Sequence, residues 1–213
     1  MVRGVFITIE GGEGTGKSTQ VARLAELLRD AGLSVTVVRE PGGTRVGEAV
    51  REILLDREHA GLDARAELML YEASRAQLVR EVLMPALVAG GVVVCDRFTD
   101  STTAYQGYGR GLPLYEVASL NRFATTGLEP DLTIVLDLDV VEGLGRAVGP
   151  GGADRLEAEE IEFHERVRDG FHRIAAEEPA RVRVLEAVGT VDEVAARIRE
   201  VVEGLPVLGA VLH

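Results

Sequence analysis

Close to the N-terminus the chain reads Val5-Phe6-Ile7-Thr8-Ile9-Glu10-Gly11-Gly12-Glu13-Gly14-Thr15-Gly16-Lys17-Ser18, an apolar run followed by a glycine-rich loop. The loop fits the pattern G-x-x-x-x-G-K-[ST], which binds phosphate when a strand precedes it and a helix follows it. Residues 5–9 are β-rich, and beyond Lys17 apolar residues recur at helical spacing. Both conditions are met, so this stretch predicts a phosphate-binding loop between a strand and a helix.

The residue types of the loop suit phosphate chemistry. Glycine lets the backbone curl so that successive N–H groups point at phosphate oxygens, and the dipole of the following helix adds positive charge there. Lys17 is placed to reach the β- and γ-phosphates of a nucleotide, and the hydroxyl of Ser18 to bind Mg²⁺. The residues expected to hold the nucleotide are Gly11, Gly12, Glu13, Gly14, Thr15, Gly16, Lys17, Ser18 and Thr19.

One lysine is present in the whole chain. Of the 23 Lys and Arg residues, only Lys17 is a lysine. A compact ammonium on a flexible stem fits among phosphates where a planar guanidinium does not. The retained lysine therefore supports the phosphate-binding interpretation over a glycine-rich turn that matches by chance.

Composition narrows the classes of protein. The 213 residues are 46% hydrophobic, enough for a full core, and the net charge of −12 disfavours a protein that coats nucleic acid with a basic face. An anionic small substrate stays compatible where arginines converge. The lone Cys95 lies in an apolar run, where we expect a buried strand residue. Neither a signal peptide nor a membrane-spanning run is apparent, so we expect a cytoplasmic protein that binds neither membrane nor nucleic acid.

Apolar β-type runs alternate with helical stretches, which predicts an α/β fold with a doubly wound, five-stranded parallel sheet and helices on both faces. We predict one domain over residues 1–213, with a tail at 204–213 that packs on the body or frays. Pro85 is expected to interrupt one long helix. The predicted strands are 5–9, 35–39, 92–96, 132–137 and 182–186. The predicted helices are 17–31, 45–56, 63–89, 113–127, 140–147, 157–178 and 190–203.

Charged residues stand where the second and third strands end, the edge at which such folds bind ligands. Arg39 opens the turn Arg39-Glu40-Pro41-Gly42-Gly43-Thr44 and is placed to face a phosphate, although alone it also fits a solvated loop. Asp96 and Arg97 close the third strand. The carboxylate suits Mg²⁺ or its waters, and the guanidinium can hold an acceptor phosphate.

Tyr71 and Arg75 are spaced i, i+4 in a predicted helix and share one face. An aromatic ring beside a guanidinium can stack on a base and hydrogen-bond its edge. Helical spacing alone fits a core tyrosine and a surface arginine better. The base-binding interpretation therefore depends on the rest of the sequence.

From Phe6 to about Arg168 the sequence resembles the bacterial thymidylate kinases (dTMP kinases), a family of P-loop nucleoside monophosphate kinases. The resemblance implies phosphoryl transfer from ATP with Mg²⁺ to dTMP, in a homodimer. Besides the P-loop, the matching segments are Ile9-Glu10-Gly11, Arg39-Glu40-Pro41-Gly42-Gly43-Thr44, Tyr71 with Arg75, Asp96-Arg97, Ser101-Thr102, Ala104-Tyr105-Gln106-Gly107, Glu129-Pro130-Asp131-Leu132, Asp154-Arg155-Leu156-Glu157 and Phe163-His164-Glu165-Arg166-Val167-Arg168.

The resemblance also implies roles for individual residues. Tyr71 takes the place of an aromatic residue that stacks on thymine, and Tyr105 lies against the sugar, where it disfavours a 2′-hydroxyl. Glu13 sits near the 3′-hydroxyl and the magnesium ion, and joins Lys17 and Arg97 among the expected catalytic residues. The residues expected to bind dTMP are Arg39 and Arg97 at the phosphate, Arg75, Thr102 and Gln106 at the base edge, and Ser101, Tyr71 and Tyr105.

A lid over ATP is expected near residues 146–157. The segment departs from the family pattern because Val148 stands where relatives often have a second arginine, and the Gly/Pro run after it suggests flexibility. Arg146 and Arg155 are the candidates to stabilise charge on the transferred phosphoryl group. Capping or surface pairing is the alternative for both arginines.

Other functions were weighed against the same residues. A kinase for a different nucleotide or small metabolite would use the same scaffold. The resemblance to the family favours dTMP, whereas the chemistry of the residues alone does not single it out. A GTPase switch needs Asn-Lys-x-Asp and a ParA-like ATPase needs a second lysine, so a chain whose sole lysine is Lys17 excludes both. The intact Lys17, Ser18 and Asp96 argue against a P-loop kept only as a structural relic.

Overall fold

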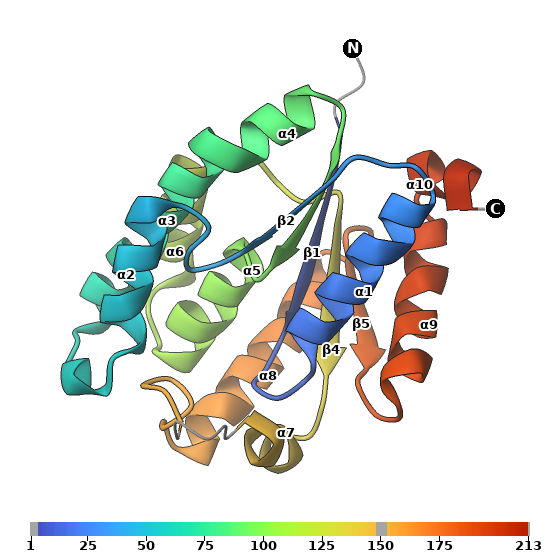
Figure 1. Ribbon diagram of the computed structural model, residues 1–213. Coiled ribbons are helices and arrows are strands. Elements are labelled where there is room, and N and C mark those ends of the chain that lie inside the picture. Colours follow the sequence, from blue (N-terminus) through green and yellow to red (C-terminus); the bar gives the residue numbers. More distant parts are fainter. Residues whose placement is uncertain (1–3, 148–152, 213) are drawn as a thin grey trace.

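The computed structural model describes residues 4–147 and 153–212. Within these residues, five parallel strands form one sheet in the order β2-β3-β1-β4-β5 (Figure 1). The strands are β1 (Val5–Gly11), β2 (Val35–Arg39), β3 (Val92–Asp96), β4 (Leu132–Asp137) and β5 (Val182–Glu186). The predicted fold class is confirmed, and β1 runs on to Gly11 because it continues its pairing with β4 as far as Leu136.

Helices cover both faces of the sheet (Figure 1). On one face lie α1 (Lys17–Asp30), α9 (Val191–Glu203) and α10 (Pro206–Leu212). On the other lie α3 (Ala64–Leu78), α4 (Met84–Val88) and α8 (Ile161–Glu177). The chain also forms α2 (Arg45–Leu55), α5 (Thr99–Thr102), α6 (Leu114–Thr125), α7 (Val140–Ala147) and the short turns η1 (Arg57–His59), η2 (Val79–Leu83) and η3 (Thr103–Gly109).

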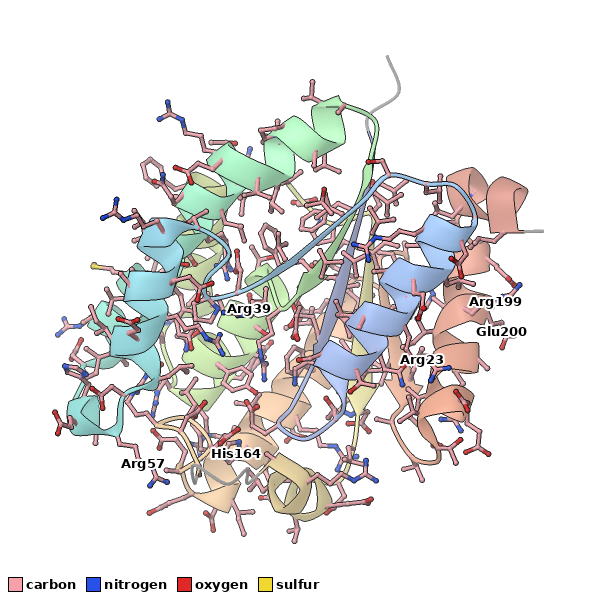
Figure 2. The ribbon with its side chains drawn as sticks, viewed as in Figure 1. Arg23, Arg39, Arg57, His164, Arg199 and Glu200 are labelled. Atoms are coloured by element: carbon pink, nitrogen blue, oxygen red, sulfur yellow. The ribbon has the colours of Figure 1, made fainter. Side chains whose placement is uncertain are left out.

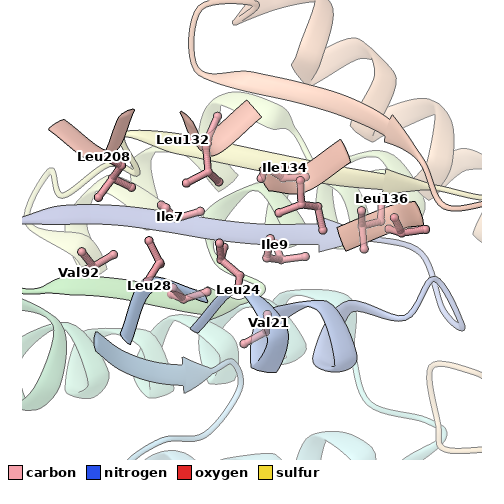
Figure 3. Packing of buried hydrophobic residues seen from close by; sticks show 14 of the residues in the cluster. Ile7, Ile9, Val21, Leu24, Leu28, Val92, Leu132, Ile134, Leu136 and Leu208 are labelled. Carbon is pink, nitrogen blue, oxygen red and sulfur yellow. The ribbon is translucent and has the colours of Figure 1, made fainter. Parts of the chain in front are cut away.

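The central strand is buried on both faces, which explains its continuous apolar sequence. Successive side chains of a strand point to opposite faces, so Ile7 and Ile9 pack against α1 and α9 while Phe6 packs toward α3 and α4. Figure 3 shows Ile7 and Ile9 beside Val21 and Leu24 of α1. The rigid centre of the sheet therefore carries the glycine-rich loop at its end.

The strand register brings the expected site residues to one edge. Ile9 of β1 and Arg39 of β2 both pair with Asp96 of β3. The chain winds first to one side of β1 and later to the other, so a crevice opens beyond this edge. Residues that follow different strands thus converge there.

The helix predicted at 63–89 is divided into α3, a π-helical turn and α4. The division is what the position of Pro85 predicts, since proline lacks the N–H that would continue the i→i−4 ladder. The helix predicted at 157–178 begins later, at Ile161. Asp154 accepts hydrogen bonds from the N–H groups of Leu156 and Glu157 and holds a separate turn before it.

Besides the single turn η1, two helical segments were not predicted. Residues 99–109 form α5 and η3, where neither a helix nor a strand was predicted. Burial outweighs propensity here, because Ala104 and Tyr105 pack into the cluster under α8. The tail forms α10, and Leu208 is buried in the cluster of α1 and α9, so the described tail packs on the body.

Candidate active site

The glycine-rich loop leaves β1 and ends at the first turn of α1. Gly14 and Gly16 adopt left-handed conformations, with φ of 65° and 84°, and Gly16 is the N-cap of α1. A Cβ on Gly14 would lie 1.9 Å from the carbonyl oxygen of Gly143 in α7. The loop can therefore take this path beside α7 only with glycine at position 14.

Lys17 is buried at the start of α1 and its Nζ donates to the carbonyl oxygen of Gly12 over 2.5 Å. Burial, together with the nearby guanidinium of Arg97, lowers the pKa of Lys17 to about 8, against the opposing charge of Glu13. A negative phosphate nearby would favour the charged ammonium and raise that pKa. The ammonium group of Lys17 is therefore held where it would stabilise the negative charge of a bound phosphate.

Ser18, at the start of α1, and Asp96, at the end of β3, lie next to each other. The Ser18 hydroxyl donates to Oδ2 of Asp96 over 2.7 Å, which brings together residues that are 78 positions apart in sequence. Within residues 4–147 and 153–212, no cluster of three or more His, Cys, Asp or Glu side chains could hold a metal ion. The pair offers two hard oxygen atoms, which fits Mg²⁺ completed by waters and nucleotide phosphates.

Glu13, Arg97 and Tyr105 form a connected group above the loop. Oε1 of Glu13 accepts from Nη2 of Arg97 over 2.8 Å and from the hydroxyl of Tyr105 over 2.6 Å. The guanidinium also lies 4.9 Å from the centre of the Tyr105 ring. Burial alone would raise the pKa of Glu13, but Arg97 and Lys17 bring it down to about 2. This carboxylate is ionised across the physiological range.

Glu10 supports this group from inside the sheet. It is fully buried, and it accepts hydrogen bonds from the N–H of Phe98 and the hydroxyl of Ser101. Ser101 in turn accepts from Arg97 over 3.2 Å. Burial, reinforced by the charge of Asp100, raises the pKa of Glu10 to about 8. Sequence reasoning gave Glu10 no role of its own, although an acid at the end of an apolar strand was a signal for one.

Arg75 is an interior residue with 1% of its surface exposed, not the surface arginine that helical spacing favours. A guanidinium has five N–H donors. All of them have protein acceptors here, so a hydrogen bond from Arg75 to a base edge would have to replace one of these contacts. The acceptors are Glu40, Glu72, Asn121, the carbonyl oxygen of Phe98 and the hydroxyl of Thr102.

A cleft of about 400 Å³ joins these groups. Arg39, labelled in Figure 2, lines it from the end of β2 and is paired with Glu48 over 2.8 Å. Gly11, Gly12 and Thr15 line a smaller hollow behind the loop. The other expected binding residues that line the cleft are Glu13, Gly14, Gly16, Lys17, Ser18, Thr19, Tyr71, Arg75, Asp96, Arg97, Ser101, Thr102, Tyr105 and Gln106.

Arg51 and Glu40 also line the cleft and were not predicted to do so. Arg51 lies on α2 and donates to the carbonyl oxygen of Pro41 over 3.0 Å. No motif in the sequence singles it out. Glu40 belongs to the turn that was recognised after β2, but only the structure places it beside Arg75.

The two candidate lid arginines have different surroundings. Arg146 is exposed and pairs with Glu142 of the same helix. The first carbon of its side chain lies next to the glycine-rich loop, since a Cβ on Gly14 would be 3.1 Å from the Cβ of Arg146. Arg155 is buried in an ion pair with Glu67 and is not among the described residues that line the cleft. Residues 148–152, including Val148 and the expected flexible run, lie outside the described residues.

Comparison with known proteins decides the family. The family model described as thymidylate kinase matches residues 9–198. The chain belongs to the thymidylate kinase family. It is 53% identical over 205 residues to the thymidylate kinase of Solidesulfovibrio magneticus, covering 93% of this chain and 98% of that protein. It is 53% identical over 198 residues to that of Deinococcus radiodurans, covering 93% and 96%.

A solved structure in the family agrees with the fold. The crystal structure of thymidylate kinase from Ehrlichia chaffeensis matches with a TM-score of 0.78 and 35% sequence identity. The match covers 93% of this chain and 98% of that one. No helix in the described part of this chain is both long and apolar enough to cross a membrane.

The raised pKa of Glu10 predicts a pH-dependent difference in stability between this thymidylate kinase family member and its Glu10→Gln variant. The carboxyl group has a pKa of about 8 in the folded state but ionises near 4.5 once the chain is unfolded. The contribution of the Glu10 carboxyl group to folding stability is therefore complete below about pH 4.5 and is lost as pH rises through about 8. Glutamine has no such titration.

Denaturant unfolding of both proteins between pH 5 and 8.5 measures this difference. We expect the stability of the wild type to fall relative to Glu10→Gln as pH rises. A difference that stays constant over that range would contradict the assignment of a raised pKa to Glu10.

Proposed function

We propose that this protein transfers the γ-phosphoryl group of ATP to dTMP, producing dTDP and ADP. One observation carries the proposal: the phosphate loop and a polar, aromatic pocket share a single cleft. Lys17 and Ser18 of the loop line the cleft, and so do Tyr71 and Gln106. Arg97, which also lines it, donates to the carbonyl oxygen of Gly11 in the loop and pairs with Glu13. A donor and an acceptor phosphate can therefore meet beside Arg97.

In this reaction the protein positions the two nucleotides and neutralises the charge on their phosphates, and it forms no covalent bond with either. An oxygen of the dTMP phosphate attacks the γ-phosphorus of ATP in line. A new P–O bond forms, the bond from the γ-phosphorus to the β–γ bridging oxygen breaks, and ADP leaves with the electron pair. Loop N–H groups, Lys17 and Arg97 stabilise the charge that spreads over the transferred group.

Ser18 and Asp96 are the residues that would hold Mg²⁺. When bound, the ion supplies positive charge to the phosphate oxygens of the nucleotide. The hydroxyl and carboxylate, already 2.7 Å apart, need no large movement to present their oxygens to it.

Tyr105 and Glu13 suit the sugar of a deoxynucleotide. The ring of Tyr105 is buried, and its hydroxyl is bonded to Glu13, which fixes both side chains next to Arg97. A sugar lying against the ring would have its 3′-hydroxyl near the carboxylate and would leave little room for a 2′-hydroxyl.

A panel of acceptors tests the proposal. ADP release is measured with ATP, Mg²⁺ and one of dTMP, dUMP, UMP, dCMP, AMP or GMP, or with no acceptor. We expect kcat/KM to be highest for dTMP. If another monophosphate were preferred, the kinase activity would stand but dTMP would be wrong as the acceptor. If ADP were released without any acceptor, the protein would not be a nucleotide kinase.

The lid arginines should separate into two roles. Arg146 begins beside the loop, so Arg146→Met is expected to lower kcat by about 10³-fold or more, as loss of an arginine finger does, with stability unchanged. Arg155→Met leaves the buried Glu67 with one partner fewer and is expected to cost about 3–5 kcal/mol of folding free energy. Steady-state rates and denaturant unfolding of both variants measure this. The reverse pattern would assign the phosphoryl contact to Arg155.

We extend the proposal to a homodimer. Met69 of α3 and Phe123 of α6 are 61% and 83% exposed, and these two helices pack side by side. A second copy of the chain would remove such apolar surface from water. Sedimentation of the wild type should show a dimer and Phe123→Glu a shift toward monomer, whereas a monomeric wild type would contradict the extension.

A further inference from the structure

Glu67 lies behind the cleft, in the first turn of α3, and none of its surface is exposed. Its two carboxylate oxygens receive four hydrogen bonds or ion pairs. Oε1 accepts from Nε2 of Gln106 over 2.8 Å and from Nε of Arg110 over 3.1 Å. Oε2 accepts from Nη2 of Arg110 over 3.1 Å and pairs with Nη1 of Arg155 at 2.6 Å.

These partners keep the Glu67 carboxylate ionised. Guanidinium groups stay protonated in proteins, so two permanent positive charges face it. Burial raises the pKa of Glu67, but the hydrogen bonds and charges of its partners outweigh burial and lower it overall. An ionised carboxylate has no hydrogen to donate and can only accept.

This restriction fixes which way the amide of Gln106 turns. The atom that faces Glu67 must be the NH₂ group, because a carbonyl oxygen there would meet a carboxylate oxygen with no proton between them. The amide oxygen Oε1 is then directed away from Glu67. Gln106 lines the cleft, and among the described residues no hydrogen-bond donor is found for this oxygen.

We propose that Glu67 is a positioning residue that orients Gln106 to present a carbonyl acceptor to the base in the cleft. The inference deepens the proposed function and rests on it. A base that carries an N–H donor at ring position 3, as thymine and uracil do, can satisfy the acceptor. Cytosine has an unprotonated nitrogen there and would place two acceptors against each other.

The neighbouring Thr102 fits the same class of base. Its hydroxyl oxygen accepts from Nη2 of Arg75 over 2.8 Å, which leaves its hydrogen free to donate. Thr102 also lines the cleft. A donor from Thr102 beside an acceptor from Gln106 complements the carbonyl and N–H edge of thymine or uracil.

The test is the ratio of kcat/KM for dTMP to that for dCMP in the Glu67→Gln variant. A glutamine at position 67 can donate or accept, so the amide of Gln106 is free to turn. We expect the ratio to fall by about 10-fold or more, with the loss for dTMP appearing mainly in KM. One tenfold step corresponds to 1.4 kcal/mol.

Two controls separate positioning from a merely structural role. Arg110→Met removes an ion pair from Glu67 but leaves the carboxylate facing Gln106, so stability should fall while the dTMP/dCMP ratio holds. In a Gln106→Met background, Glu67→Gln should change the ratio no further, because the group it orients is absent. An unchanged ratio in Glu67→Gln, or an equal change in Arg110→Met, would overturn the proposal.

Two further measurements apply if Glu67→Gln does not fold. Glu67→Asp keeps the charge but withdraws the carboxylate by one methylene, and should lower the ratio in the same direction. For the wild type, dTMP methylated at N3 should lose at least about 10-fold in kcat/KM against dTMP. Equal use of the methylated substrate would overturn the proposal. A wild type without preference for dTMP would instead reject the proposed function, so the two failures are distinguishable.

Discussion

The cleft depends on the pairing of buried guanidinium groups with carboxylates. Removing a charge from water is costly unless a partner compensates it. Arg75 lies between Glu40 and Glu72, and Arg97 is bonded to Glu13. Arg110 and Arg155 both pair with the buried Glu67, and the half-buried Arg181 pairs with Asp100. An acidic chain can therefore bind anionic nucleotides, because its carboxylates hold the arginines in place and its net charge says little about the local field of the cleft.

We infer that the same pairings contribute to the specificity of the cleft. Carboxylates only accept hydrogen bonds, so each one dictates which atoms of its neighbours face it and which are left for a ligand. Glu13 fixes Tyr105 and Arg97, and Glu67 fixes Gln106. Residues that never touch the substrate can thus decide which base edge the cleft accepts. A buried acid that bonds a neutral side chain lining a pocket is a useful indicator of such a role.

The sequence predicted the architecture well and the polar interior poorly. Strands, their order of appearance and most helices follow from apolar periodicity, and the phosphate loop follows from its glycines and Lys17. The sequence does not predict the helical segment at residues 99–109, because it is stabilised by the burial of Ala104 and Tyr105 and no local pattern reveals that burial. The partners of Arg75 and Arg155 come from elements far apart in sequence, so periodicity could not show that both are buried. Most of the expected cleft residues were found because each directly follows a strand or repeats a family motif.

A crystal structure of the protein with dTMP and an unreactive ATP analogue would test this account most directly. The account predicts the dTMP phosphate at Arg97, the base against Tyr71, and the carbonyl oxygen of Gln106 within hydrogen-bond distance of ring nitrogen 3, while its amide NH₂ stays on Glu67. A base bound elsewhere, or a Gln106 amide separated from Glu67 with dTMP in the cleft, would contradict it.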